Sequence, residues 1–406
     1  MVAHIRNRHI TDLYKNILSF SPLVGIFGHR QVGKTTFLEQ VAASYQSFDD
    51  EDVLKMAESR PKQFLNELGK KPAGIDECQL SPKLFPALKE FVRLNKRPGQ
   101  IVLSGSVRFY SRDAIRESLT GRIVNIDLLP LCLNELYELD RAKLVVSLLS
   151  RNTLPDSLEA SLTSTQLKQR ENALEAYDQR GGLPGLCFMR NTQLQTARLR
   201  EQLNLLLDRD LRLIYPTSLS YLQIQDFVRA LAQREGDVFR STTLRRETGL
   251  AEATQKKLLH ALESIFLIRT LPIEGSRHGV SVYFEDQLEW RFLNDEQIDA
   301  QRAFEGLVFR NIRASFNYEI GLAYRFFQFR KSPDICVPFA VKVKETSIGF
   351  LPIITASPTR QQLRSAHQFL QTYNHAFVVI ITKGHATTTI FDRRILVMPA
   401  ERILFE

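Results

Sequence analysis

The sequence has few cysteines and no apolar segment long enough to cross a membrane. Its 406 residues include four cysteines, and no two of them form a C-x-x-C pair, which argues against a zinc site or a disulfide framework. No apolar run approaches the roughly 20 residues that a membrane-spanning helix requires. The N-terminal segment, MVAHIRNRHITDLYK, lacks the apolar core of a secretion signal. We therefore expect a cytoplasmic protein with no membrane partner.

Acidic residues are outnumbered by basic ones. The chain carries 54 Lys and Arg against 45 Asp and Glu, a net charge of +9. This excess fits a partner rich in phosphate, such as a nucleotide or a nucleic acid, although a solvated basic face gives the same balance. Apolar residues make up 44% and charged residues 24% of the chain, as in ordinary globular proteins, and the length suits two to four domains.

One stretch, GIFGHRQVGKTTFLEQV at 25–41, carries a phosphate-binding motif. It fits G-x-x-x-x-G-K-[ST] at Gly28, Gly33, Lys34 and Thr35. A short apolar segment precedes it, which predicts a buried parallel strand, and apolar residues at helical spacing follow it. This order of strand, loop and helix is the context that the motif requires.

The chemistry of a phosphate cradle explains the residues of this loop. Glycines allow a tight turn whose N–H groups, together with the positive end of the new helix, hold phosphate oxygens. Lys34 can reach the β- and γ-phosphates, and Thr35 can offer its hydroxyl to Mg²⁺. The predicted nucleotide-binding residues are Gly28, His29, Arg30, Gln31, Val32, Gly33, Lys34, Thr35 and Thr36.

Two adjacent acids follow further along the chain, in KPAGIDECQLSP. A short apolar lead-in ends at Asp76 and Glu77, as expected at the end of a strand. Asp76 is a candidate to hold Mg²⁺ together with Thr35, and Glu77 is a candidate to orient or deprotonate the attacking water. Adjacent carboxylates are also common on protein surfaces, so it is their place after the loop that favours the catalytic interpretation.

Two further residues could complete a hydrolytic site. Ser104 ends the apolar strand predicted at 101–103, and ligands of open α/β sheets lie beyond the carboxyl ends of strands. Its hydroxyl could contact the γ-phosphate or the water, or simply belong to a turn. Arg122 follows Gly121 and could neutralise developing charge at the site of a neighbouring subunit, or be a plain surface arginine.

Together, the motifs GHRQVGKTT, IDECQLSP, IVLSGS, SLTGR, LLPLCLNEL and GGLPG resemble those of a group of prokaryotic AAA+ ATPases. In that group a winged helix and a restriction-endonuclease-like domain of unknown function, number 4143, follow the ATPase core. The resemblance implies ATP as the nucleotide, Mg²⁺ as the metal and a homo-oligomer in which an arginine acts in trans. It implies these roles: ATP and Mg²⁺ binding by Gly33, Lys34 and Thr35, Walker B acids at Asp76 and Glu77, a sensor at Ser104 and the family's G-R arginine at Arg122.

The resemblance also implies a domain order of the α/β class. We expect an AAA+-like P-loop core over 1–138, a helical lid over 139–216, a winged helix over 217–290 and a nuclease-like α/β domain over 291–406. GGLPG has a glycine where the family often has glutamate, so it is assigned no chemistry. The DRD triplet at 208–210 resembles a family signature, with ordinary pairing on a helix face as the alternative.

The predicted winged helix makes DNA a candidate partner. Basic and amide side chains suited to phosphates and base edges lie on its two helices and its wing; they are Arg245, Arg246, Gln255, Lys256, Lys257 and Arg277. Glu252 and Glu263 lie on the same helix and would repel phosphate. A purely structural winged helix is therefore the alternative.

The last predicted domain resembles a nuclease fold whose site reads Glu…Asp…Glu-x-Lys. Glu305 and Asp334 match the first two positions, whereas the third acid is replaced by Lys342 or by Ile354, depending on the alignment. One carboxylate fewer weakens the affinity for a hard dication. We therefore predict that nuclease chemistry is lost and that the domain serves for binding or assembly.

These patterns favour Mg²⁺-dependent ATP hydrolysis coupled to conformational change. The alternative is a nucleotide-gated regulatory module that binds DNA or protein with little turnover. A P-loop kinase fits less well, because the adjacent acids Asp76 and Glu77 favour water as the acceptor. The preference for ATP over GTP follows from the resemblance, since we find no guanine-reading N/T-K-x-D pattern at a suitable place.

Overall fold

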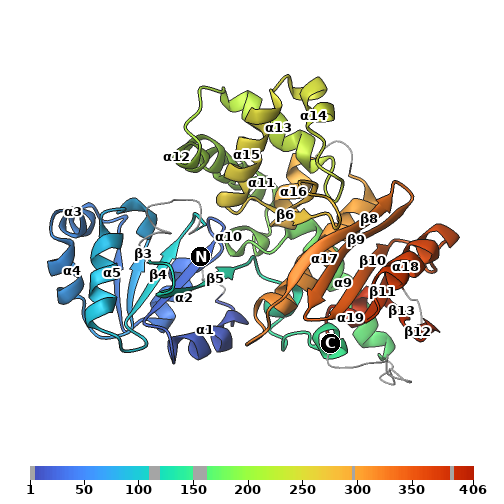
Figure 1. The fold of residues 1–406 in the computed structure, drawn as a ribbon, viewed down its shortest axis with the longest axis horizontal. Helices are drawn as coiled ribbons and strands as arrows, with labels where there is room; N and C mark the ends of the chain where they lie inside the picture. Colours follow the sequence, from blue (N-terminus) through green and yellow to red (C-terminus); the bar gives the residue numbers. More distant parts are fainter. Residues whose placement is uncertain (1–4, 109–118, 150–161, 295–297, 385–387) are drawn as a thin grey trace.

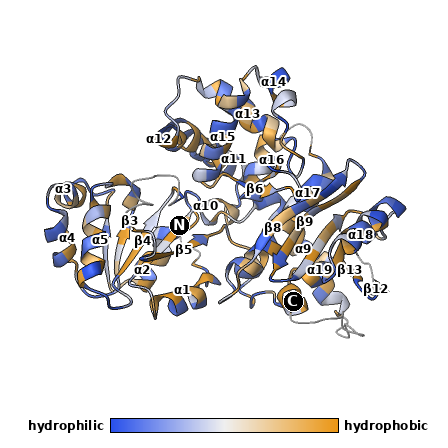
Figure 2. Cartoon of the chain, in the orientation of Figure 1, coloured by the Kyte–Doolittle hydropathy of each residue, from blue (hydrophilic) through white to orange (hydrophobic). Residues whose placement is uncertain are grey.

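The computed structural model describes residues 5–108, 119–149, 162–294, 298–384 and 388–406. A parallel-sheet domain, a cluster of helices and a mixed-sheet domain follow one another along the chain and lie side by side (Figure 1). Strands of both sheets are largely apolar, whereas the outer helices carry many polar residues (Figure 2). The α/β class predicted from the sequence is confirmed. No described helix is long and apolar enough to span a bilayer.

Five parallel strands form the first sheet, in the order β2-β3-β4-β1-β5. Their bounds are β1 Leu23–Gly28, β2 Ser44–Ser47, β3 Ala73–Asp76, β4 Ile101–Gly105 and β5 Ile123–Leu128. Leu23 of β1 lies opposite Ile101 on one side and Ile123 on the other. Every residue of β1 is buried, as expected for a parallel strand covered on both faces.

Two apolar clusters cover this sheet. The helices are α1 Ile10–Leu18, α2 Lys34–Val41, α3 Glu51–Ser59, α4 Pro61–Glu67 and α5 Leu84–Leu94, and a 3-10 turn, η1, spans Cys78–Leu80. One cluster includes α3, α4 and α5, and the other includes α1 and α2. Because parallel strands end at one edge of a sheet, the loops that follow β1, β3 and β4 meet there.

Helices dominate the middle of the chain. Their bounds are α11 Thr192–Leu205, the π-helical turn η3 Leu206–Asp210, α12 Leu211–Ile214, α13 Tyr221–Ala232, α14 Ser241–Thr248, α15 Glu252–Ser264 and α16 Gln287–Leu293. These helices share one apolar core. Strands β6 Ile268–Pro272 and β7 Val280–Phe284 form an antiparallel hairpin beside them. The helices and hairpin expected over 217–290 are present, and their assignment as a winged helix stays a prediction.

The segment 139–216, predicted as one helical lid, packs in two places. Helices α8 Leu144–Leu148 and α9 Ser164–Arg180 contribute to the core of the C-terminal domain, as does the short α7 Leu133–Leu136 before them. Helices α10 Pro184–Cys187 and α11 contribute to the core of the helical cluster. The domain boundaries therefore stay a prediction.

One of the predicted DNA-contacting side chains is unavailable. Gln255 of α15 is fully buried, and its amide donates to the carbonyl oxygens of Leu250, at 2.8 Å, and Ser241, at 3.2 Å. Its proposed role in reading base edges is therefore wrong, because the side chain closes the turn between α14 and α15. Lys256 and Lys257, which follow it, are exposed.

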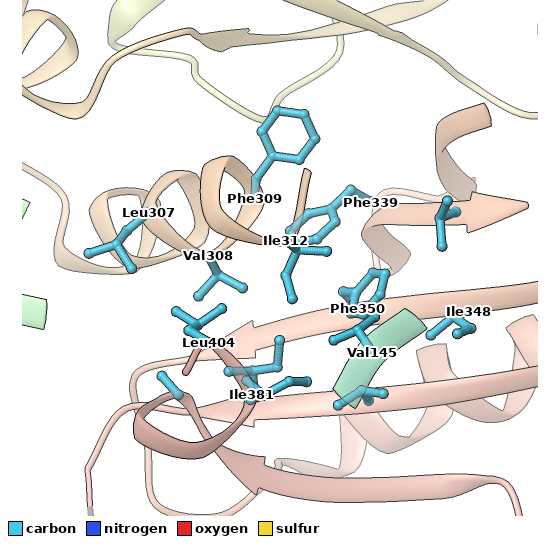
Figure 3. Packing of buried hydrophobic residues seen from close by; sticks show 14 of the residues in the cluster. Val145, Leu307, Val308, Phe309, Ile312, Phe339, Ile348, Phe350, Ile381 and Leu404 are labelled. Atoms are coloured by element: carbon cyan, nitrogen blue, oxygen red, sulfur yellow. The ribbon is translucent and has the colours of Figure 1, made fainter. Parts of the chain in front are cut away.

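A six-stranded mixed sheet forms the C-terminal domain, in the order β12-β13-β11-β10-β9-β8. Its strands are β8 Arg325–Ser332, β9 Ile335–Val343, β10 Thr346–Ile353, β11 Ala376–Thr382, β12 Thr389–Asp392 and β13 Ile395–Pro399, with helices α17 Ala300–Asn317, α18 Arg360–Thr372 and α19 Ala400–Ile403. Side chains of α17, including Ile312, meet Phe339 and Phe350 of the sheet (Figure 3). Helix α18 contributes to a second cluster with strands of this sheet.

Candidate nucleotide-binding site

The P-loop lies between the end of β1 and the start of α2, as the motif predicts. Gly33 has a φ of 97°, which favours glycine, and a Cβ on Gly28 would lie 2.3 Å from the Leu128 carbonyl oxygen. The loop lines a cavity of about 490 Å³. The lining residues are Ile5, Arg6, Arg8, Arg30, Gln31, Gly33, Lys34, Thr35, Thr36, Phe37, Gln40, Glu77, Leu131, Pro184 and Gly185.

Lys34 begins α2 with its side chain buried among the loop carbonyls. Its ammonium donates to the carbonyl oxygens of Gly28 at 3.1 Å and of His29 at 2.9 Å. Burial lowers the pKa of Lys34, and the nearby carboxylates of Glu77 and Asp76 act in the opposite direction. A cation that is held by weak carbonyl acceptors is suited to exchange them for anionic oxygens.

Asp76, at the end of β3, accepts hydrogen bonds from three side chains. Thr35 Oγ1 donates to its Oδ2 at 2.6 Å, Tyr45 Oη donates to the same oxygen at 3.0 Å, and Ser104 Oγ donates to its Oδ1. The two predicted metal ligands, Thr35 and Asp76, are thus in contact, with Ser104 of β4 on the other carboxylate oxygen. Oxygen atoms gathered in this way are the donor set that Mg²⁺ prefers.

Tyr45 is a member of this group that sequence reasoning missed. It lies on β2, opposite Gly74 of β3, and therefore reaches the end of β3 from the neighbouring strand. A tyrosine in a short polar strand carries no motif. Only the order of strands in the sheet brings its hydroxyl to Asp76.

Glu77 follows in a left-handed backbone conformation, with φ 52°. Its carboxylate accepts a hydrogen bond from Gln79 Nε2, which also lies 3.3 Å from Ser106 Oγ. Burial raises the pKa of Glu77, and the charge of Lys34 partly opposes this. The predicted base thus borders the P-loop cavity, is only partly exposed and has an amide partner, Gln79, that the sequence analysis did not single out.

Arg122 lies away from this group. It directly precedes β5 and lies opposite the start of β1, whereas the P-loop follows the end of β1. Its guanidinium donates to the Thr120 carbonyl oxygen at 3.3 Å. Parallel strands separate these two edges of the sheet, so Arg122 is unsuited to act on the nucleotide of its own chain. The predicted action in trans stays a prediction.

The DRD triplet reaches the P-loop. Asp210 is buried at the end of η3 and pairs with Arg30 Nη1 at 3.2 Å, while Arg209 lines a small cavity together with Glu77 and Ser106. The alternative from the sequence, pairing along a helix face, holds for Asp208, which pairs with Arg212 at 3.0 Å. Since Asp210 and Arg30 lie far apart in the chain, the sequence carried no signal of their contact.

A second link joins the P-loop to the helical cluster. His29 Nε2 lies 3.2 Å from the carboxylate of Glu289 on α16, and both side chains are buried. Burial alone would lower the pKa of His29, but the Glu289 carboxylate, together with the Arg30 carbonyl and the charge of Asp286, outweighs it and raises that pKa. Asp286, at the N-terminus of the same helix, accepts from the Gly182 amide at 2.7 Å. GGLPG therefore connects the cluster to the nucleotide cavity, which Gly185 lines.

A buried ion pair between Arg8 and Glu135 lies against the P-loop. Arg8 Nε lies 3.1 Å from Glu135 Oε1, and Arg8 Nη1 donates to the Val32 carbonyl oxygen at 2.9 Å. Glu135 also accepts from the backbone amides of His9 and Cys132. The NEL end of LLPLCLNEL thus holds the N-terminal segment against the P-loop, a role that its sequence did not reveal.

The two acids matched to the nuclease motif have different surroundings. Glu305 of α17 accepts a hydrogen bond from Tyr283 Oη of β7 at 2.7 Å, and burial raises its pKa to about 7. Asp334 is exposed in the turn between β8 and β9. Across the described ranges, no three His, Cys, Asp or Glu side chains form a group that could hold a metal ion.

Comparison with protein families finds two matches. Residues 21–137 match the family model described as AAA domain, and residues 171–277 match the one described as Domain of unknown function (DUF8612). The first range contains the P-loop, Asp76, Glu77 and Ser104, and it supports a P-loop ATPase that binds nucleotide. The second family carries a different number from the domain resembled by the sequence. Neither match confirms the winged helix or the nuclease-like domain.

Relatives with similar sequences are uncharacterized. The proteins Mb2031c of Mycobacterium bovis and Rv2008c of Mycobacterium tuberculosis are each 25% identical over 423 residues, covering 98% of this chain and 85% of theirs. Among solved structures, Aeropyrum pernix ORC1 in complex with DNA aligns with a TM-score of 0.31 and 12% identity, over 72% of this chain and 94% of that one. Protein VC1899 of Vibrio cholerae aligns with a TM-score of 0.16 and 11% identity, over 90% of each chain. Both scores are too low to carry an argument about function.

Proposed function

We propose that this protein hydrolyses ATP in the presence of Mg²⁺ and couples turnover to movement of its helical cluster and C-terminal domain. One observation carries the proposal: Asp76 accepts hydrogen bonds from both Thr35 of the P-loop and Ser104 of β4. A metal ligand, a phosphate cradle and a sensor of phosphate thereby meet at one carboxylate. Glu77, the neighbouring acid, supplies the base that such a site needs.

Binding of the triphosphate falls to the P-loop. The amides of 28–36 and the N-terminus of α2 would hold phosphate oxygens, and Lys34 would exchange its two carbonyl partners for them. Ile5, Leu131 and Pro184 provide apolar surface in the same cavity against which the nucleoside could pack. The donors are already assembled, so little reorganisation opposes binding.

The residues present fit a magnesium ion. Thr35 and Asp76 would hold it, since their oxygens already lie 2.6 Å apart and both are hard ligands. When bound, the ion supplies positive charge that neutralises the phosphates. Tyr45 would keep the Asp76 carboxylate oriented through its hydrogen bond.

Glu77 would take a proton from the attacking water. Burial raises its pKa, which makes its carboxylate a stronger base than an exposed glutamate. Ser104 would hold Asp76 and report on the γ-phosphate. Two arginines are candidates for the cation that neutralises the leaving charge: Arg122 of a neighbouring subunit in a homo-oligomer, and Arg209, which lines a cavity beside Glu77 in the same chain.

Two ion pairs support the coupling to the rest of the chain. Arg30 pairs with Asp210 of η3, and His29 pairs with Glu289 of α16. Arg30 lines the nucleotide cavity, so a bound triphosphate competes with Asp210 for its guanidinium. The His29 ring is buried, so its pair with Glu289 would respond through movement of the phosphate-binding loop. Nucleotide binding would thereby weaken contacts that hold the helical cluster against the P-loop domain.

The hydrogen bond from Gln79 to Glu77 also supports a second function, a nucleotide-gated regulatory module with little turnover. An amide that occupies the base would keep it from the water until a partner displaces Gln79. In this version the predicted winged helix binds DNA or a protein, and the nucleotide state controls that binding.

Phosphate release by wild type and by Glu77→Gln separates the two functions. For the ATPase we expect the variant to lose about 100-fold or more of its phosphate release, as for removal of a general base, while its nucleotide affinity is kept. The measurement is made with and without single- and double-stranded DNA, and nucleotide binding is followed by calorimetry. A wild type that binds ATP but releases no phosphate under any of these conditions would favour the regulatory module.

A further inference from the structure

A basic cavity of about 240 Å³ lies between the helical cluster and the C-terminal sheet. Its lining residues are Arg234, Asp237, Val238, Arg240, Thr243 and Arg330. The three arginines come from three segments: the end of α13, the start of α14 and strand β8. None of these lining residues borders the nucleotide cavity, so this cavity is separate from the P-loop.

The acids beside this cavity already have cationic partners. Asp237 pairs with Arg302 Nη2 at 2.7 Å, and Glu247 pairs with Arg234. Each of these pairs cancels its own charge. The acids therefore do not neutralise the two remaining arginines of the cavity wall.

Arg240 and Arg330 keep their positive charges. In the described part of the chain, neither forms a salt bridge with an acidic side chain, and the buried Nε of Arg330 has no oxygen acceptor, although the thiol of Cys336, a weak acceptor, interacts with the same guanidinium. The residue opposite Arg330 on β9 is Cys336. Burial raises the pKa of that thiol to about 11, so it stays neutral and does not balance the guanidinium. A guanidinium whose nearby acceptor is only a neutral thiol keeps the capacity to bind an anionic oxygen.

Further donors come from the start of α14. Arg240 is the N-cap residue, and its side chain does not cap the helix. The Arg240 side chain thus leaves the start of the helix uncapped, and the positive end of the helix dipole adds to the arginine charges. Thr243, in the same turn, contributes its hydroxyl to the cavity wall.

The two sides of the cavity are held together firmly. Gln328, two positions before Arg330, is fully buried and donates from Nε2 to the Gly236 carbonyl oxygen at 2.7 Å. A backbone bridge also joins Gln328 to Ile273 at the end of β6. Strand β8 is thereby fixed to the loop that follows α13, so the backbone positions that carry the arginines are set before a ligand binds.

We infer that this cavity binds a phosphate group through Arg240 and Arg330, beside the paired Arg234. Guanidinium groups match phosphate oxygens in charge and in planar geometry. Arg240 is exposed, and exposed Arg245 and Arg246 continue the basic surface along α14. The favoured source of the phosphate is therefore a nucleic-acid backbone, which presents phosphates in a row. The inference does not depend on hydrolysis at the P-loop.

Two probes test the site on the full chain carrying Lys34→Ala, which removes phosphate binding at the P-loop. Inorganic phosphate is titrated by calorimetry, and a labelled DNA duplex is titrated by fluorescence anisotropy at several salt concentrations. Each probe is used with the parent, with Arg240→Ala/Arg330→Gln and with Arg97→Ala. Arg97 is an exposed arginine after α5, so its variant controls for the loss of one surface charge.

We expect the double variant to bind DNA about tenfold more weakly and to lose about one from the slope of log affinity against log salt, whereas Arg97→Ala leaves both unchanged. Heat of phosphate binding should vanish in the double variant. Loss of phosphate binding with unchanged DNA binding would keep the site and identify a small phosphorylated molecule as its ligand. The inference is overturned if the double variant binds both phosphate and DNA as tightly as the parent does, or if Arg97→Ala weakens DNA binding as much as the double variant does.

Since Arg330 is partly buried, its substitution could disturb folding. Arg240→Glu provides the safeguard, because Arg240 is exposed and the new carboxylate repels phosphate. Thermal unfolding and circular dichroism establish that each variant is folded. If folded Arg240→Glu binds both probes as well as the parent does, the site is excluded.

Discussion

The acids of the P-loop domain and those of the C-terminal domain make an instructive contrast. Asp76 ends a parallel strand and accepts from Thr35 and Ser104, which come from the two other segments that meet at that edge. Glu305 instead accepts from Tyr283 of the hairpin, and Asp334 lies exposed in a turn. The acids of both domains match a motif. Only Asp76, in the P-loop domain, is surrounded by the donors that its chemistry requires.

The difference lies in how the two sheets are built. A parallel sheet brings the ends of β1, β3 and β4 to one edge, so polar residues placed there by the sequence become neighbours. Strands β8 and β9 are antiparallel, so the residue between them lies at the tip of a hairpin. A motif in a parallel sheet therefore implies proximity more strongly than one that spans a helix and a hairpin.

The strongest test of the contrast between the two domains removes the ammonium group of Lys34 from the P-loop. Lys34→Ala should weaken binding of ATP by about 100-fold or more, because the two charge-assisted hydrogen bonds that it would make to phosphate are each worth about 1.5–3 kcal/mol. Calorimetry with magnesium and ATP measures the loss. Unchanged affinity on a folded sample would show that the cavity at the P-loop is not the nucleotide site.

A second test asks whether Glu305 serves folding. Its pKa is raised to about 7 in the folded chain, so it contributes stability in its protonated form, and this contribution is lost as pH rises from about 4.5 through 7. Glu305→Gln stays neutral and should lose less stability over that range, by on the order of 2 kcal/mol. Denaturant unfolding at pH 5 and pH 8 compares the two proteins. Parallel pH profiles would contradict the assignment.

A smaller effect is expected for substitution of Tyr45, the partner of Asp76 that the sequence did not reveal. Tyr45→Phe removes one of three side-chain donors to Asp76, and a single hydrogen bond contributes about 1 kcal/mol, so we expect about fivefold weaker affinity for Mg²⁺. The measurement is phosphate release over a magnesium titration. A loss as large as that of Lys34→Ala would mean that Tyr45 has a direct role instead of an orienting one.

The smallest effect is expected at Asp334. We predict that incubation of DNA with the protein and Mg²⁺ or Mn²⁺ yields no cleavage, and that Asp334→Ala behaves like the wild type, because the nuclease motif lacks one acid. Gel analysis of the digestion products is the measurement. Robust cleavage that Asp334→Ala abolishes would prove this prediction wrong and would remove the contrast between the two domains.

The sequence by itself determined the α/β class, the P-loop between β1 and α2, and the placement of Asp76 and Ser104 at strand ends. These features are local: glycine spacing, an apolar strand and a following helix are encoded in consecutive residues. The sequence also predicted which edge of the sheet carries Asp76 and Ser104, because the carboxyl ends of parallel strands lie at the same edge.

Only the tertiary structure decided which side chains complete these local features. Tyr45 beside Asp76, Asp210 beside Arg30 and Glu289 beside His29 join segments that lie far apart in the chain. The tertiary structure also buries Gln255, and it places Arg122 at the amino ends of the strands, whereas the P-loop lies at their carboxyl ends. Such contacts depend on strand order and helix packing. Strand order and helix packing depend on how apolar surface is buried over the whole chain, and a short segment of sequence does not determine that burial.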